Sequence, residues 1–251
     1  MGHYYSAVYT AGIILYYHSA TVAFVAAQLG GASLTSVQTF GGQRWITHAL
    51  QGPSEQLQAK RPYHLKARVT GSRVVVTLDN IQVIDTNLNF TLPRGQSGIW
   101  VRGLHDISFA GYDVETERPK LFVVIQFTEP FNDLYTDVIR PLAQELGFEV
   151  IRADETYGPG IIIADIERHI IEAKAVIADI TPKNPNVYWE VGCAHALKKP
   201  TILFAERSTQ LPFDVSPFRT IFYDNTIAGK SKIEEGLRKH FSEIMGDFPT
   251  V

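Results

Sequence analysis

Most of the polar side chains that suggest a reactive site in this chain lie between residues 178 and 200. Asp179 falls at the end of a short apolar run, Asn184 and Asn186 flank a proline, and Glu190 follows four residues after Asn186. A carboxylate held beside a carbon that loses its leaving group can stabilise the developing cation or capture it covalently. We therefore take Glu190 and Asp179 as candidate catalytic residues. The simpler alternative for Glu190 is a solvated carboxylate that complements the dipole of its helix.

The elements that must position these side chains are a strand, a loop and a helix. The continuous apolar run 175–180 is typical of a strand buried on both faces of a parallel sheet, and Asp179 lies at its end. An asparagine can cap the free amides at a helix entry, which predicts a helix from about Asn186 to Leu197. Glu190 would then share a face with Asn186 near the positive end of the helix dipole, which favours an ionised carboxylate. Open α/β sheets bind ligands at such strand ends.

The composition is that of a globular protein with room for two ordinary domains. The chain has 251 residues, of which 45% are hydrophobic and 20% charged, and its net charge is -3. The small net charge gives no reason to expect a nucleic acid or an acidic membrane as partner. Cys193 is the only cysteine. It excludes an internal disulfide framework and a Cys-rich metal site, and we expect a reducing, cytoplasmic location with no bound metal.

One uncharged stretch, residues 7–29, must be weighed as a membrane span because it contains no Lys, Arg, Asp or Glu. His18, Ser19 and Thr21 interrupt it, and no Lys or Arg precedes Arg44 to set an orientation or to start a signal peptide. We therefore expect no membrane span.

Residues 1–117 carry the signals of many short strands and no helical period. Apolar and polar residues alternate at 63–69, and Asp79 and Asn80 tolerate the left-handed backbone of a two-residue hairpin turn. This pattern predicts an all-β sandwich of the jelly-roll kind, most simply a structural or self-association module. The predicted strands are 5–10, 12–17, 22–28, 36–40, 63–70, 73–78, 81–85, 98–102 and 107–112.

A charged, Pro-containing segment at 114–120 is the predicted linker. Residues 118–251 have a different pattern of predicted elements. Strands now alternate with helices, which predicts a flavodoxin-like five-stranded parallel sheet with an order such as 2-1-3-4-5. The predicted strands are 121–125, 148–153, 175–180, 201–204 and 220–223, and the predicted helices are 131–146, 161–173, 186–197 and 232–244.

Three segments of this second half resemble a known superfamily. They are Phe-Val-Val-Ile-Gln-Phe-Thr-Glu-Pro-Phe at 122–131, Arg-Ala-Asp-Glu-Thr-Tyr-Gly-Pro-Gly at 152–160, and the stretch 178–200. Over residues 120–225 the chain resembles the bacterial TIR-like and nucleoside 2-deoxyribosyltransferase-like superfamily. The strand rhythm and turn glycines of residues 12–114 loosely resemble a laminin-G or concanavalin-like sandwich.

The resemblance implies an enzyme that cleaves N-glycosidic bonds, in nucleosides or in NAD. The superfamily's catalytic glutamate falls on Glu190, its strand-end acid on Asp179, and the asparagine of its Asn-x-x-x-Glu motif on Asn186. Around these we expect a substrate pocket made from three loops and the start of the helix. The expected substrate-binding residues are Gln126, Phe127, Tyr157, Gly158, Gly160, Asn184, Asn186 and Trp189.

Two members of that set have ordinary alternatives. The loop of Tyr157, Gly158 and Gly160 precedes a helix whose free amides could hold phosphate, but it also fits an ordinary βα loop. Trp189 could cover the pocket or form a subunit contact, whereas core packing is the commoner fate of a tryptophan.

We expect hydrolysis of NAD to nicotinamide, with NAD as substrate and no cofactor. Nicotinamide in NAD is already cationic and leaves without a general acid, whereas a neutral base needs a second acid. A bacterial defence role, activated by assembly into a homo-oligomer, is implied by the resemblance only. The alternatives are a nucleoside or nucleotide N-glycosidase or 2-deoxyribosyltransferase, and a non-catalytic nucleotide-binding receptor. The sandwich would sense a signal, bind a protein or carbohydrate partner, or drive assembly.

Overall fold

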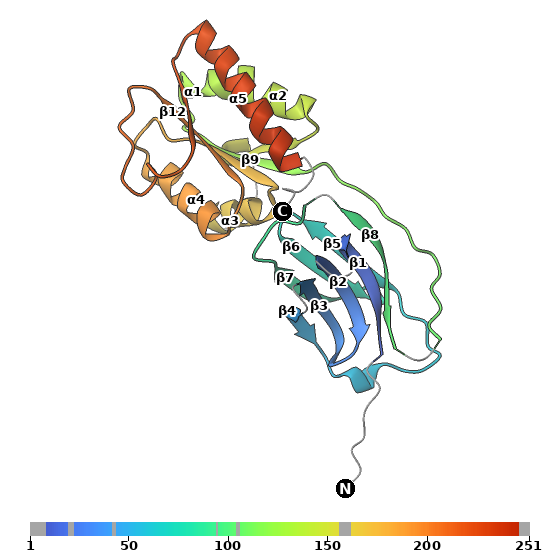
Figure 1. The fold of residues 1–251 in the computed structure, drawn as a ribbon. Helices are drawn as coiled ribbons and strands as arrows, with labels where there is room; N and C mark the ends of the chain where they lie inside the picture. Colours follow the sequence, from blue (N-terminus) through green and yellow to red (C-terminus); the bar gives the residue numbers. More distant parts are fainter. Residues whose placement is uncertain are drawn as a thin grey trace. The chain divides into compact units, whose positions relative to one another are not determined.

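The computed structural model describes residues 9–19, 23–41, 44–93, 95–103, 106–155 and 162–245. The chain divides into two compact units, and their main boundary lies between Thr116 and Glu117. The first unit is built of strands and the second of alternating strands and helices (Figure 1). The predicted fold class, an all-β sandwich followed by a flavodoxin-like α/β domain, is confirmed.

The first unit contains two antiparallel sheets. The larger has the order β4-β3-β2-β1-β8, and the smaller has the order β5-β6-β7. Strands β3 and β4 contact β7, and Val37, Val74 and Val76 are fully buried. The strands are β1 (Thr10–Ser19), β2 (Ala23–Gly30), β3 (Ser33–Gly41), β4 (Arg44–Gln51), β5 (Leu65–Thr70), β6 (Arg73–Leu78), β7 (Ile81–Asn87) and β8 (Gln96–Arg102).

The turn predicted at Asp79 and Asn80 is confirmed, since both residues have positive φ angles, 50° and 67°, between β6 and β7. One strand prediction for this unit was wrong, and one strand was missed. Residues 107–112 are irregular, and β4 was not predicted at all. Most side chains of β4 are exposed or half-buried, so its sequence lacks the alternation of a half-buried strand, and pairing with β3 defines it. The strand predicted at 5–10 lies mostly outside the described residues.

The second unit is a parallel sheet with the order β10-β9-β11-β12-β13, which is the predicted order 2-1-3-4-5. The strands are β9 (Lys120–Val124), β10 (Glu149–Arg152), β11 (Ala175–Asp179), β12 (Thr201–Glu206) and β13 (Thr220–Tyr223). The principal helices are α1 (Phe131–Leu134), the π-helical turn η2 (Tyr135–Ile139), α2 (Arg140–Glu145), α3 (Ile162–Glu172), α4 (Pro185–Ala196) and α5 (Ile227–Met245), and η3 (Ala153–Glu155) is a short 3₁₀ turn. Another short 3₁₀ turn, η1 (Ser54–Gln56), belongs to the first unit. Helix α5 begins five residues before its predicted start at 232.

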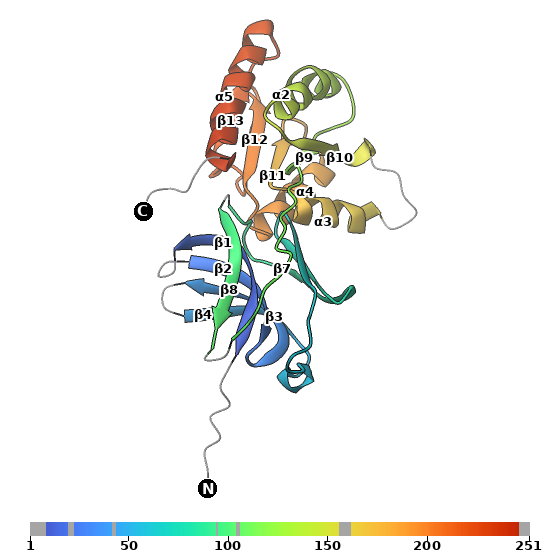
Figure 2. The same cartoon turned by 90° about the vertical axis from the view of Figure 1, so that its right-hand side faces the viewer.

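Two apolar clusters sandwich the parallel sheet, because successive residues of a strand point to opposite faces. Ala175 and Ile177 of β11 belong to the cluster under α1, η2, α2 and α5. Val176 and Ala178 belong to the cluster under α3 and α4. The two helical layers lie on opposite sides of the sheet (Figures 1 and 2). Because the five strands are parallel, their carboxyl ends and the loops that follow them lie along one edge of the sheet.

No helix among the described residues is long and apolar enough to cross a membrane. The uncharged segment 7–29 contains β1 and β2 in its described part.

Candidate active site

Five residues mark the carboxyl edge of the parallel sheet, one from each strand or the loop that follows it. Arg152, Asp179, Glu206 and Tyr223 are the last residues of β10, β11, β12 and β13, and Gln126 follows β9. Parallel strands bring these positions to the same edge, where α/β proteins bind ligands. Helix α4, which follows β11 and its loop, carries Glu190 as its sixth residue.

Helix α4 begins one residue earlier than predicted, and its cap is Asn184. The Asn184 side chain accepts a hydrogen bond from the Asn186 amide at 3.0 Å, and Pro185 occupies the first helical position. The Asn186 side chain is exposed. Asn184 therefore has a structural role that explains where α4 starts, whether or not it also contacts substrate.

Glu190 lies on the buried stripe of α4 together with Val187, Val191 and Ala194. These three apolar residues hold the helix against the sheet, and Glu190 is only 8% exposed. Asn186 and Glu190 lie four residues apart in α4, as predicted, but Asn186 is exposed at the start of the helix whereas Glu190 is buried. A carboxylate at such a core position costs stability unless it is paired. The simpler alternative, a solvated dipole-complementing glutamate, does not fit this burial.

Burial raises the pKa of the Glu190 carboxyl to about 7. Among the described residues, no side chain or amide donates a hydrogen bond to it. This rise in the pKa is opposite to the fall expected from the helix dipole. Glu190 is the sixth residue of α4, beyond the first turn in which the dipole acts most strongly, so desolvation dominates. The site therefore holds a carboxylate that is ready to ionise near neutral pH and is not neutralised by the described residues.

Asp179 is almost completely buried, at 1% exposure, and both of its carboxylate oxygens are engaged. Oδ1 accepts from the Thr181 amide at 2.8 Å, and Oδ2 accepts from the Tyr223 hydroxyl at 2.6 Å. Burial raises the pKa of Asp179, while the hydrogen bonds from Thr181 and Tyr223 act in the opposite sense. The same burial and the neighbouring Asp179 charge raise the pKa of Tyr223, so the phenol keeps its proton and donates it.

Phe127 forms the outer layer of a stack of three side chains. The Arg152 guanidinium lies 5.3 Å from the centre of the Phe127 ring and 4.2 Å from the centre of the Tyr135 ring. Asp154 accepts two hydrogen bonds from Arg152, at 2.6 and 2.7 Å, and Asn132 accepts a third at 3.0 Å. Phe127 remains 47% exposed. The stack therefore presents an aromatic ring with a fixed backing at the carboxyl edge.

The other predicted site residues divide into two groups. Gln126 donates to the Thr128 hydroxyl at 2.8 Å, and Trp189 is 44% exposed on α4, so it does not have the core role that is commoner for tryptophan. The predicted residues Tyr157, Gly158 and Gly160 lie outside the described residues.

Three residues at this edge were missed by the sequence analysis: Arg152, Glu206 and Tyr223. Each is the last residue of its strand, and that position is the signal that could have identified them. The Glu206 carboxylate is half-buried, and its charge contributes to the raised pKa of Asp179 and Tyr223. Among the described residues, its side chain also has no hydrogen-bond donor.

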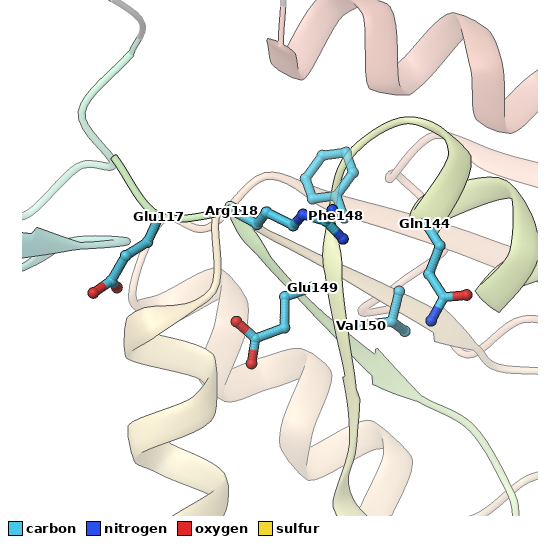
Figure 3. Close-up of a pocket in the computed structure, with 6 residues that line it drawn as sticks. All are labelled: Glu117, Arg118, Gln144, Phe148, Glu149 and Val150. Carbon is cyan, nitrogen blue, oxygen red and sulfur yellow. The ribbon is translucent and has the colours of Figure 1, made fainter. Parts of the chain in front are cut away.

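No group of three or more His, Cys, Asp or Glu side chains within the described ranges could hold a metal ion. A hollow in the second unit lies away from the site, near the amino-terminal ends of β9 and β10 (Figure 3). Its lining residues are Glu117, Arg118, Gln144, Phe148, Glu149 and Val150. The strand-end residues Arg152, Asp179, Glu206 and Tyr223 lie at the opposite edge of the sheet.

Comparison with protein-family models gives no match, and neither does comparison with curated proteins. Among solved structures, a 2-deoxyribosyltransferase from Bacillus psychrosaccharolyticus is 16% identical, with 46% of this chain and 90% of that chain covered and a TM-score of 0.39. A CMP N-glycosidase from Clostridium botulinum is 20% identical, with 47% and 98% covered and a TM-score of 0.36. The carbohydrate-binding module CBM66 from Bacillus subtilis is 15% identical, with 38% and 62% covered and a TM-score of 0.31. Similarity at this level does not identify a function.

Proposed function

We propose that this protein hydrolyses the N-glycosidic bond between nicotinamide and ribose in NAD. The observation that carries the proposal is Glu190, a buried carboxylate with a pKa of about 7 and no donor among the described residues. A buried carboxyl with a raised pKa is the kind of group that active sites use.

The chemistry needs one such carboxylate. When the bond between the ribose C1 and the nicotinamide nitrogen breaks, its electron pair goes to the pyridinium nitrogen, and positive charge develops on C1 and the ring oxygen. The Glu190 carboxylate stabilises this cation or forms an ester with C1. Water then adds to C1, one proton is released, and the products are nicotinamide and ADP-ribose. Because nicotinamide leaves as a neutral molecule, no general acid is required.

The remaining residues of the edge have supporting roles in this proposal. Phe127, backed by Arg152 and Tyr135, offers a surface on which the planar pyridinium stacks. The Asn186 side chain is available for ribose hydroxyls, since it is exposed. Asp179 supports the loop that leads into α4, through its bonds to Thr181 and Tyr223.

One observation favours a second candidate, a nucleoside N-glycosidase or 2-deoxyribosyltransferase. The half-buried Glu206 carboxylate has no donor among the described residues and acts electrostatically on Asp179 and Tyr223. The departure of a neutral base calls for a second acidic side chain beside the leaving group. The NAD reaction requires only Glu190, so we place it first.

The deciding experiment incubates the purified protein with NAD and with a panel of nucleosides and nucleotides, and follows free base by chromatography. We expect the wild type to release nicotinamide from NAD. In Glu190→Gln the rate of release should fall by about a thousandfold or more, as it does when other groups that stabilise transition-state charge are removed. Glu243→Gln, on the exposed face of α5, is the matched control and should keep full activity. Free base from nucleosides but not from NAD would favour the second candidate. Ligand binding without turnover, weakened in Glu190→Gln, would favour a receptor.

We also propose that the sandwich serves assembly or partner binding, and that assembly into a homo-oligomer activates the second unit. The same assay, run over a range of protein concentrations, tests whether activity requires assembly. Specific activity should rise with protein concentration if assembly is required, and it should stay constant if it is not.

A further inference from the structure

Tyr223 is connected to the candidate site by a buried hydrogen bond that spans the sheet. Its hydroxyl donates to Asp179 Oδ2 at 2.6 Å. Strand β12 lies between the two strands that carry these residues, so the bond links β13 to β11 across an intervening strand. A hydrogen bond to a buried carboxylate is stronger than one between neutral groups.

The same bond belongs to a chain of contacts that holds the start of the β11–α4 loop, residues 179–181. The Glu206 amide donates to the Thr181 hydroxyl at 2.9 Å, and that hydroxyl lies 3.4 Å from the Tyr223 hydroxyl. The Ile180 amide donates to the Phe204 carbonyl at 2.9 Å. These contacts come from β12 and β13 alike, so the loop is held from two neighbouring strands.

Helix α4 is tied to the same three residues. The Tyr188 hydroxyl donates to the Ile180 carbonyl at 3.3 Å, and Asn184, four residues after Ile180, caps the helix. Glu190 lies two residues beyond Tyr188. Residues 179–181 are therefore linked by a hydrogen bond to the first turns of α4, the helix that carries Glu190.

We propose that Tyr223 is a positioning residue that holds Asp179, and through Asp179 and Thr181 fixes the loop that sets the position of Glu190. This inference rests on the proposed function for its catalytic consequence. Asp179 is only 1% exposed, and its two oxygens accept hydrogen bonds from Thr181 and Tyr223, so in this proposal it acts through the loop and does not contact substrate. The ring of Tyr223 packs in the core cluster under α5, and only its hydroxyl serves this purpose.

The first test does not depend on turnover. Tyr223→Phe keeps the buried ring and removes the hydroxyl, and hydrogen exchange is followed for peptides that cover residues 179–184. We expect exchange there to accelerate about tenfold, because one charge-assisted hydrogen bond is lost. Peptides from β9 serve as an internal reference, and Tyr112→Phe, at an exposed tyrosine before the second unit, is the matched control. Unchanged exchange at 179–184, or an equal rise in β9, would overturn the proposal.

The second test separates positioning from substrate contact. With NAD as substrate, Tyr223→Phe should lower kcat about tenfold and change KM less than twofold, since the carboxylate is misplaced but no binding group is removed. Asp179→Asn should lower kcat in the same way, and the double variant should be no worse than the poorer single variant, because the two residues act as a unit. A KM increase in Asp179→Asn that Tyr223→Phe does not share would show that Asp179 contacts substrate and would overturn the assignment.

The two tests distinguish the failure of this inference from the failure of the proposed function. If the wild type releases no nicotinamide, the proposed function fails, and the exchange measurement still decides whether Tyr223 holds the loop. If the wild type is active and the exchange is unchanged in Tyr223→Phe, the proposed function stands and the positioning role is rejected.

Discussion

At the scale of single residues, the burial of the Glu190 carboxylate destabilises the folded protein. The burial of Val187, Val191 and Ala194 on the same stripe of α4 stabilises it. The pKa of the Glu190 carboxyl is raised from the ordinary value of 4.5 to about 7 by burial. Between these two pH values the folded protein keeps a proton that the unfolded chain has lost, so stability falls as the pH rises through this window. Below it both states are protonated, and above it the penalty is constant.

A neutral side chain at position 190 avoids the destabilisation caused by the buried, ionised carboxylate. Glu190→Gln should raise the free energy of unfolding at pH 8 by about 1–2 kcal/mol, allowing for screening by the remaining solvent contact. At pH 5 the gain should be much smaller. Urea unfolding at the two pH values measures the difference, with Glu243→Gln as the control that shows no pH-dependent gain. A variant that is less stable than the wild type at pH 8 would mean that Glu190 is paired in the folded protein.

The second prediction concerns the reaction. A carboxylate that stabilises or captures the ribosyl cation must be ionised, so kcat/KM for NAD should rise with pH and level off above about 7, the pKa of Glu190. Initial rates of nicotinamide release between pH 5.5 and 8.5 measure this profile. A rate that falls steadily over the same range would instead require a protonated group, and would favour the mechanism with a general acid.

At the scale of elements, the start of α4 depends on one capping side chain. Asn184→Ala removes the acceptor of the Asn186 amide and should lower the free energy of unfolding by about 1 kcal/mol. Asn186→Ala is the matched control, because its exposed side chain caps nothing and the change should be within about 0.5 kcal/mol. Chemical denaturation measures both. Equal losses in the two variants would show that capping does not decide where this helix begins.

The β9–α1 loop carries the other element-scale prediction. Phe127→Ala removes the outer ring of the stack on Arg152 and should raise KM for NAD about tenfold while kcat changes little, because a stacking surface acts on binding. Phe213→Ala, at an 86% exposed phenylalanine in the loop after β12, is the control with unchanged KM. If kcat falls and KM does not, Phe127 contributes to the chemical step and not to base stacking.

At the scale of the whole molecule, each unit has its own buried core, and this predicts two unfolding transitions in calorimetry. Val76→Ala in β6 should lower one transition, since it empties a fully buried site at a cost of roughly 2 kcal/mol. At pH 8, Glu190→Gln should raise the other transition and leave the first unchanged. A single transition that both substitutions shift would show that the units unfold together.

Much of the architecture could be read from local patterns. The strand order of the second unit follows from alternating strands and helices, and the hairpin at Asp79 and Asn80 follows from turn chemistry. The strand β4 could not be found this way, because its exposed side chains carry no alternation and its partner β3 defines it. The segment 107–112 has a strand-like composition but no strand partner among the described residues, so the prediction of a strand from its composition was wrong.

Local patterns were enough to predict that Asp179 and Glu190 belong to one strand–loop–helix segment of a parallel sheet, because hydrophobic period and helix capping are properties of neighbouring residues. The burial and raised pKa of Glu190, and the hydrogen bond from Tyr223 to Asp179, 44 residues away, became known from the folded chain. Desolvation and long-range hydrogen bonds depend on which surfaces other elements cover, and no local pattern specifies that.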